Sequence, residues 1–149
     1  MKRSPALQVL SRDHQHALDV ALRLRRADAT TVRDAVHRLL TFFEEGERHF
    51  RAEESCLVPA LLPCDSAWAA ALERMACDHA AIREQVAAIT KSDYKLPLAR
   101  SVGSLLQAHV RFEERVLFPM LERALPNARL EALAKALYDF EQRLTASPR

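Results

Sequence analysis

Apolar residues recur every three or four positions along most of this chain, which is the spacing of one buried face of an α-helix. The first stretch of this kind runs from Pro5 to Arg26, and the second runs from Val32 to about Leu61. A third stripe covers residues 68–89, and a fourth begins at Pro97 and continues to Leu117. The pattern predicts four long helices.

Polar and helix-breaking residues separate the four stripes. The connections are Ala27–Thr30, Pro63–Ser66 and Lys91–Lys95. We expect Thr30 or Thr31 to be the N-cap of the second helix, and Asp65 or Ser66 to be that of the third. Short polar side chains at this position bond the free N–H groups of a first helical turn.

Beyond Pro126, Asn127 is the expected cap of a last helix, Ala128 to Thr145. Short connections between long helices favour antiparallel neighbours. We therefore predict an all-α fold, in which an up-down-up-down four-helix bundle (about 5–124) carries an additional C-terminal helix (about 127–146), in one domain of residues 1–149. The additional helix would pack on the outside of the bundle or mediate association into a homodimer.

Composition excludes several classes of protein. Two Gly among 149 residues are too few for the tight turns of a many-stranded sheet. A hydrophobic content of 49% is too high for a disordered chain. The net charge is +2, with both signs interspersed, and the short basic cluster at residues 23–26 has no aromatic partners. We therefore expect no nucleic-acid partner.

No feature of the sequence indicates a membrane or an exported protein. The uncharged stretch Ser55–Cys64 has only ten residues and contains two prolines, so it is too short to span a bilayer. The first 16 residues lack a sustained apolar region and a small-residue cleavage site, so no signal peptide is predicted. The three cysteines lack C-x-x-C spacing. We expect reduced thiols in the cytoplasm.

One segment of the sequence occurs twice. The first copy reads HFRAEESCLVPAL from His49, and the second reads HVRFEERVLFPML from His109. The His, the Arg, both Glu, one Leu, the Pro and the last Leu coincide without a gap. An Asp-His pair precedes each copy on the previous predicted helix, at Asp13-His14 and at Asp78-His79. The unit is therefore Asp-His, a long gap, and then HxxxEE with Pro, used twice.

The i, i+4 spacing of His and Glu gives this repeat its chemistry. Four helical residues turn through about 400°, so His49 and Glu53 share one face, as do His109 and Glu113. His14 and His79 lie on the apolar stripes of the other two helices. Four imidazoles and two carboxylates are thus predicted to point inward.

Buried carboxylates are costly unless they are paired or bind a cation. Arg83 is the only cation on the inward-facing stripes, so a pair of metal ions resolves the conflict. If each glutamate bridges two ions, each ion receives two His nitrogens and two Glu oxygens. Mixed N/O ligation suits Fe or Mn, with Zn also allowed, and about six-fold coordination leaves positions for oxo, hydroxo, water or a diatomic ligand.

The duplicated motif resembles the hemerythrin family, specifically bacterial hemerythrin-like domains with HHE cation-binding motifs, over roughly residues 7–125. The resemblance implies a di-iron centre bridged by two carboxylates and an oxo or hydroxo group. Carried over by position, it gives the metal ligands His14, His49, Glu53, His79, His109 and Glu113. Two departures stand out. Arg83 occupies the place of a fifth histidine of the oxygen carriers, and their bridging-Asp spacing falls on Glu114.

Several polar residues near the motif need not be ligands. Helical geometry favours Glu113 over Glu114 as the bridge, because position i+5 lies about 140° from the histidine. We expect Glu54 and Glu114, and also Asp13 and Asp78, to face solvent. Glu45 shares the metal-facing stripe and is a candidate ligand or neighbour. The remaining two histidines, His16 and His37, are predicted to lie outside the site.

Three functions follow from this interpretation. The first is a non-catalytic di-iron protein that binds or senses O₂ or NO, or serves iron homeostasis. The second is a di-iron redox enzyme that acts on peroxide or NO, or in iron–sulfur cluster repair. The third is a helical interaction module with a structural metal. The sequence leaves open which of them applies, and therefore also whether the protein is an enzyme.

Overall fold

A computed structural model describes residues 2–61 and 66–146 of the chain. These residues form helices and no strand, so the prediction of an all-helical fold is confirmed. The α-helices are α1 (Pro5–Arg26), α2 (Val32–Ala52), α3 (Val58–Ala60), α4 (Ser66–Lys91), α5 (Leu96–Phe112), α6 (Phe118–Ala124) and α7 (Asn127–Ala146). Within the described ranges, none of them is long and apolar enough to cross a membrane.

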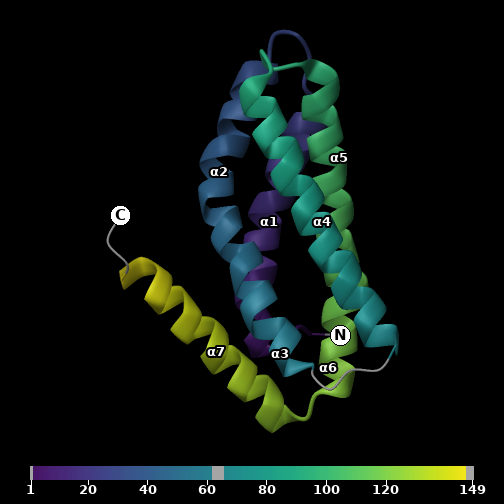
Figure 1. The fold of residues 1–149 in the computed structure, drawn as a ribbon, viewed down its shortest axis with the longest axis vertical. Coiled ribbons are helices and arrows are strands. Elements are labelled where there is room, and N and C mark those ends of the chain that lie inside the picture. The colour runs from purple at the N-terminus through teal and green to yellow at the C-terminus, as the bar shows by residue number, and fades with distance from the viewer. Residues whose placement is uncertain (1, 62–65, 147–149) are drawn as a thin grey trace.

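The four long helices α1, α2, α4 and α5 lie side by side with their axes roughly parallel (Figure 1). The α1–α2 and α4–α5 connections lie at one end of the molecule, and α3 and α6 lie at the other. Helix α1 packs on α5 and α2, and α4 packs on α5. The helices therefore enclose a common interior along their whole length.

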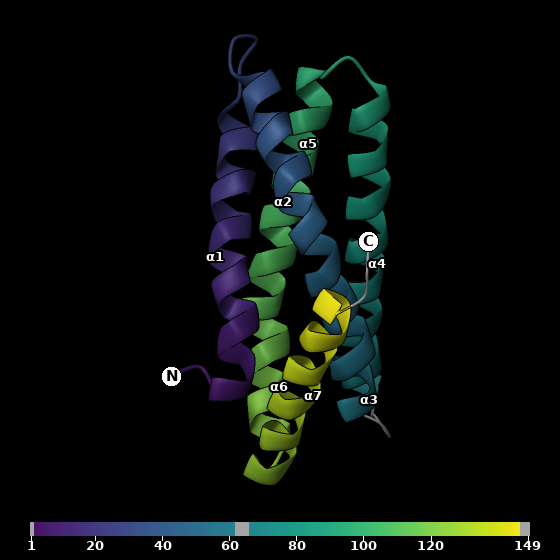
Figure 2. The same ribbon diagram turned by 90° about the vertical axis from the view of Figure 1, so that its left-hand side faces the viewer.

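Helix α7 turns back from the end that holds α6 and lies on the outside of the long helices (Figure 2). It contacts α1 and α2, and its residues Leu133 and Leu137 are buried there. The helix begins at Asn127 itself, because the carbonyl of Pro126 accepts the first bonds, from the N–H groups of Arg129 and Leu130. The predicted N-cap, Asn127, is therefore the first residue of the helix, and Pro126 is the residue before it.

Apolar side chains fill the interior in two clusters with a polar layer between them. On α1, Leu10 belongs to one cluster and Ala17 to the other, and His14 lies between them. On α4, Met75 and Ile82 flank His79 in the same way. The helical period that buries the apolar stripes therefore buries these histidines too, halfway along the bundle.

A wide π-helical turn interrupts each copy of the repeat: η1 covers Glu53–Leu57 and η2 covers Glu113–Leu117. The matching prolines Pro59 and Pro119 follow these turns. In a regular α-helix a proline ring clashes with the carbonyl four residues before it, and in both copies that carbonyl lies inside the wide turn. The predicted long helices are helical throughout, but the periodicity did not indicate this local widening.

The start of α2 differs from the prediction. Thr31 is the residue before the helix, but its side chain makes no capping bond. The Asp28 carboxylate instead accepts the N–H groups of Thr30 and Thr31, at 2.8 and 3.0 Å. The predicted position of the N-cap at Thr31 is therefore confirmed, but the capping bond is not, because Asp28 accepts the N–H groups of this turn. The predicted cap of the third helix lies outside the described residues, except for Ser66, where α4 begins.

Candidate metal centre

The structure brings the six predicted ligands together in the polar layer. Their ligand atoms form two groups of four, and within each group all of the atoms lie within 4.8 Å of one another. The first group is His14, His49, Glu53 and Glu113, and the second is Glu53, His79, His109 and Glu113. Both glutamates belong to both groups, which is the arrangement expected of side chains that bridge two cations.

Each of the long helices supplies one imidazole to this centre. The histidines are His14 on α1, His49 on α2, His79 on α4 and His109 on α5. The two glutamates are the first residues of η1 and η2, and both are fully buried. The i, i+4 spacing predicted from the sequence is therefore kept up to the point where each helix widens.

The Glu53 carboxylate spans the two halves of the centre. Its Oε1 lies 3.0 Å from Nε2 of His49, and its Oε2 lies 3.2 Å from Nε2 of His79. Oε2 of Glu113 lies 3.0 Å from Nε2 of His14 and 3.4 Å from Nε2 of His109. Each glutamate thus faces one imidazole of each group.

Several buried polar atoms of the centre have no hydrogen-bond partner among the described residues. These include both carboxylate oxygens of Glu53 and of Glu113, Nε2 of His79 and both ring nitrogens of His109. Leaving such atoms unsatisfied inside a protein is costly. Nε2 of His14 also lies only 3.0 Å from Nε2 of His49. Lone pairs of nitrogen and oxygen that converge in this way fit a pair of cations.

Carboxylates also face the other nitrogen, Nδ1, of each imidazole in the first group. Nδ1 of His14 lies 2.7 Å from Oε1 of Glu114. Nδ1 of His49 lies 3.1 Å from Oδ2 of Asp13. A carboxylate on Nδ1 fixes the ring orientation, and leaves Nε2 free to bind a metal.

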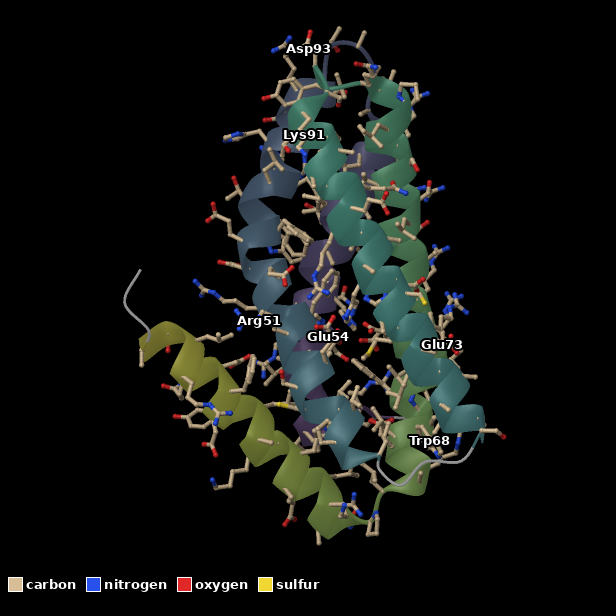
Figure 3. The ribbon with its side chains drawn as sticks, in the orientation of Figure 1. Arg51, Glu54, Trp68, Glu73, Lys91 and Asp93 are labelled. Carbon is tan, nitrogen blue, oxygen red and sulfur yellow. The ribbon has the colours of Figure 1, made fainter. Side chains whose placement is uncertain are left out.

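The second group repeats this arrangement. Nδ1 of His79 lies 2.8 Å from Oε1 of Glu54, which lies between the ribbons of α2 and α4 (Figure 3). Nδ1 of His109 lies 3.5 Å from Oδ2 of Asp78, which is an ion-pair distance but not a hydrogen bond. Glu54 therefore orients the imidazole of His79, as Glu114 does that of His14.

The expectation of side chains that face solvent holds for Asp13, which is half exposed, but Asp78, Glu54 and Glu114 are only partly exposed. The prediction compared each of these residues with its neighbour in the sequence, the His or Glu on the same helix. Adjacent residues of a helix point about 100° apart, so the comparison placed these side chains away from the centre. Each instead faces an imidazole on a neighbouring helix. The doublets Asp-His and Glu-Glu therefore each supply one side chain to the two groups and one carboxylate that faces an imidazole of the groups.

The charges of the centre are mutually compensating. Burial lowers the pKa of His14, but the close carboxylates, above all Glu113, outweigh it and raise the pKa to about 11. Against the same effect of burial, Glu53 raises the pKa of His49 to about 9, and Glu113 with Glu53 raises that of His79 to about 10. Burial opposes ionisation of Glu53, but the imidazoles hold its pKa well below the usual range. Protons and metal cations would therefore compete for these nitrogens.

Arg83, in the place of a fifth histidine, turns to carboxylates beside the centre. Its guanidinium lies 2.8 Å from Glu47 and 2.8 Å from Glu54. On the other side, Arg3 lies 2.8 Å from Oε2 of Glu114. Each carboxylate that orients an imidazole through a Glu-Glu doublet is therefore braced by an arginine.

The remaining sequence candidates lie outside both groups. His16 and His37 are exposed, as predicted, on α1 and α2. Glu45 is also exposed and belongs to neither group. The structure supports no ligand role for Glu45, although the sequence placed it on the metal-facing stripe of its helix.

Comparison with known proteins agrees with this geometry. The family model of the hemerythrin HHE cation-binding domain matches residues 6–121 of the chain. No curated protein and no solved structure matches it. The matched segment contains all six residues of the two groups and all four long helices from their first turns. The chain therefore belongs to the hemerythrin HHE cation-binding domain family.

Proposed function

We propose that this protein is a cytoplasmic di-iron protein whose centre binds O₂ or NO, for sensing or for iron homeostasis. One ion would be held by His14 and His49 and the other by His79 and His109, with Glu53 and Glu113 bridging them. The observation that carries the proposal is that both glutamates belong to both groups of converging atoms. We infer that α1, α2, α4 and α5 form the up-down-up-down four-helix bundle that holds this centre.

The number of donor atoms fits zinc as well as iron, but only iron would keep positions for an exogenous ligand. Two imidazoles and two carboxylate oxygens would complete the four-fold coordination that zinc prefers. Iron takes about six ligands and therefore keeps positions for a small exogenous molecule. An iron pair supplies electrons as well as these positions. Manganese would fit the same donors, so metal analysis has to accompany the test of function.

The chain's own residues prepare the centre for that role. Asp13, Glu54 and Glu114 hold three of the rings with Nε2 directed inward. The two apolar clusters above and below the centre make its surroundings largely apolar. A centre with fixed donors in an apolar surround changes little on ligand binding, which suits reversible binding.

A redox enzyme that acts on peroxide or NO is the second candidate. The observation that favours it is the placement of Arg83, which pairs with Glu47 and Glu54 and leaves each group with two imidazoles. Both ions would then have open positions, so two exogenous atoms could react between them. This candidate predicts turnover where the first predicts a stable adduct.

Anaerobic purification followed by optical spectroscopy tests the proposal. The protein should contain iron, and its spectrum should change on addition of O₂ or NO and return when the gas is removed. Irreversible consumption of peroxide or NO would favour the enzyme instead. Zinc without spectral change would contradict both and support a structural metal.

A further inference from the structure

The segment before α1 holds two glutamates beside the metal centre. The Arg3 guanidinium donates through Nη1 to Oε2 of Glu122 at 2.9 Å, and through Nη2 to Oε2 of Glu114 at 2.8 Å. The backbone N–H of Ser4 donates to the other carboxylate oxygen of Glu122 at 2.7 Å. These contacts join residues more than 100 positions apart in the sequence, and they tie the segment before α1 to η2 and α6.

Arg3 restrains Glu114 at two points. Besides the carboxylate, its Nη2 donates to the backbone carbonyl of Glu114 at 2.8 Å. The side chain of Arg3 is 20% exposed and that of Glu122 only 7% exposed, so the second glutamate is an almost buried anchor. A guanidinium presents its donors in a rigid fork, which can span two carboxylates in one geometry. Arg3 therefore fixes both the backbone and the side chain of Glu114.

Ser11 on α1 completes the surroundings of the Glu114 carboxylate. Its hydroxyl donates to Oε1 at 2.6 Å. The same oxygen lies 2.7 Å from Nδ1 of His14, whereas Oε2 accepts from Arg3. Both oxygens of Glu114 thus have donors besides the imidazole, so a rotation of the carboxylate away from His14 would break these bonds.

The ring of Phe118 links the same groups by packing. It is fully buried and stacks on the imidazole of His14, with the ring centroids 5.3 Å apart and an angle of 13° between the planes. The Arg3 guanidinium lies over the same phenyl ring, 5.4 Å from its centroid. Stacking and cation–π contacts of this kind favour one arrangement of the rings. His14 is therefore held by Glu114 at Nδ1 and by Phe118 on its face, and Arg3 contacts both of these residues.

The second group of the centre depends on a different arginine. Glu54, which faces Nδ1 of His79, is held by Arg83. Nδ1 of His109 has no hydrogen-bond partner among the residues that the structure describes. The two arginines therefore act on different groups of the centre.

We propose that Arg3 and Ser11 are positioning residues that strengthen cation binding at one of the two positions, the one that includes His14. They act by holding Glu114 against this imidazole, so the affinity of one position is set separately from that of the other. Arg3 lies outside the segment, residues 6–121, that the family model matches. The proposal rests on the proposed function only for the presence of two ions, because the contacts act on any divalent cation that these donors bind.

Titration of Co(II) into the chelator-treated whole chain, followed by visible absorption, tests the proposal, because Co(II) binds the same nitrogen and oxygen donors as iron. Arg3→Gln and Ser11→Ala should each weaken one of two equivalents by about tenfold and leave the other unchanged, because partners of a metal-bound histidine tune affinity. Arg12→Gln, which removes an exposed arginine from α1, should bind as the wild type does. Weakening of both equivalents, or of neither, would overturn the proposal.

Two further backgrounds show whether the effect passes through His14. In His14→Ala, the equivalent that remains belongs to the other position, so Arg3→Gln should weaken it no further. In His79→Ala, the remaining position includes His14, and Arg3→Gln should weaken it by the same factor as in the wild type. Arg83→Gln should give the reverse pattern. An equal effect of Arg3→Gln in both backgrounds would indicate a general loss of folding and would overturn the proposal.

Arg3→Lys separates positioning from charge. Lysine keeps the positive charge, but its ammonium group cannot reproduce the fork that joins Glu114 to Glu122. One equivalent should therefore remain weakened in this variant, while circular dichroism shows the helical content of the wild type. Full recovery of affinity with lysine would show that charge alone matters and would overturn the positioning role.

The positioning role and the proposed function fail separately. If Co(II) binding follows the expected pattern but the iron-loaded protein reacts with neither O₂ nor NO, the proposed function is wrong and the positioning role stands. If the iron-loaded protein binds either gas reversibly but Arg3→Gln behaves as Arg12→Gln does, the proposed function stands and the positioning role is wrong. A wild type that binds no Co(II) would overturn both.

Discussion

At the scale of single residues, neighbours in the sequence take different roles because they meet different helices. Glu113 converges with the imidazoles on their Nε2 side, whereas Glu114 lies 2.7 Å from Nδ1 of His14. The spacing of His and Glu sufficed to predict which residues would lie together. It could not indicate the partners on Nδ1, because those contacts join separate helices and depend on how the helices pack.

Glutamine at position 113 should affect the metal more than glutamine at position 114. Glu113→Gln removes a charged oxygen from both groups, so we expect loss of at least one ion per chain. Glu114→Gln loosens only the orientation of His14 and should lower metal affinity by about 10–100-fold. Metal titration measures both, with Glu45→Gln as the control at an exposed position. A larger loss in the Glu114 variant would contradict the bridging assignment.

Arg83→Gln tests the brace on Glu54. The ion pairs of Arg83 are half-buried and hold the carboxylate that orients His79, so we expect metal affinity to fall by about tenfold while the fold is kept. Arg38→Gln, which breaks an exposed pair with Asp34, is the matched control. Equal affinities of the two variants in a metal titration would show that the brace has no effect on the centre.

At the scale of elements, the helices followed from periodicity and their interruptions did not. The apolar stripes predicted the extents of α1 and α4 to within a few residues. The apolar pattern did not predict the π-helical turns η1 and η2, because a single wider turn hardly changes the spacing of apolar residues. The repeated prolines were a signal that could have revealed them, since a proline disturbs the turn before it.

The two helical glycines should respond to alanine in opposite ways. At Gly103, a Cβ would lie 2.8 Å from Ala21 and from Leu24, because α5 closely approaches α1 there. We expect Gly103→Ala to lower the free energy of unfolding by about 1–3 kcal/mol through overpacking. Gly46→Ala meets only ordinary contacts and should raise it by about 0.5–1 kcal/mol. Urea unfolding of both variants measures the difference, and destabilisation of similar size at both positions would contradict the assigned packing.

At the scale of the whole molecule, the interior couples metal binding to protonation. The sequence predicted a polar layer in an apolar bundle, and family resemblance suggested what it binds. Packing on the outside was one of two possibilities predicted for the last helix, but the sequence could not indicate that α7 contacts α1 and α2, because that depends on the final arrangement of the helices. The raised pKa values of three imidazoles likewise arise only from the assembled cluster.

The stability of the chelator-treated protein should fall in alkaline solution. The pKa values of His14, His49 and His79 are raised from 6.5 to about 11, 9 and 10. Their protonation therefore stabilises the fold fully below pH 6.5, and this contribution is lost as the pH rises through about 9–11. Thermal unfolding at a series of pH values measures it. The metal-loaded protein should lack this loss, because the metal has displaced the protons, so parallel curves would contradict the account.

The central claim is that one chain holds two ions between shared glutamates. Anaerobic titration of Fe(II) into the chelator-treated protein, followed by equilibrium binding, tests it most directly. The account predicts saturation at two equivalents per chain and a lower end point in Glu53→Gln, whose parent residue belongs to both groups. Saturation of the wild type at one equivalent, or no binding, would contradict it.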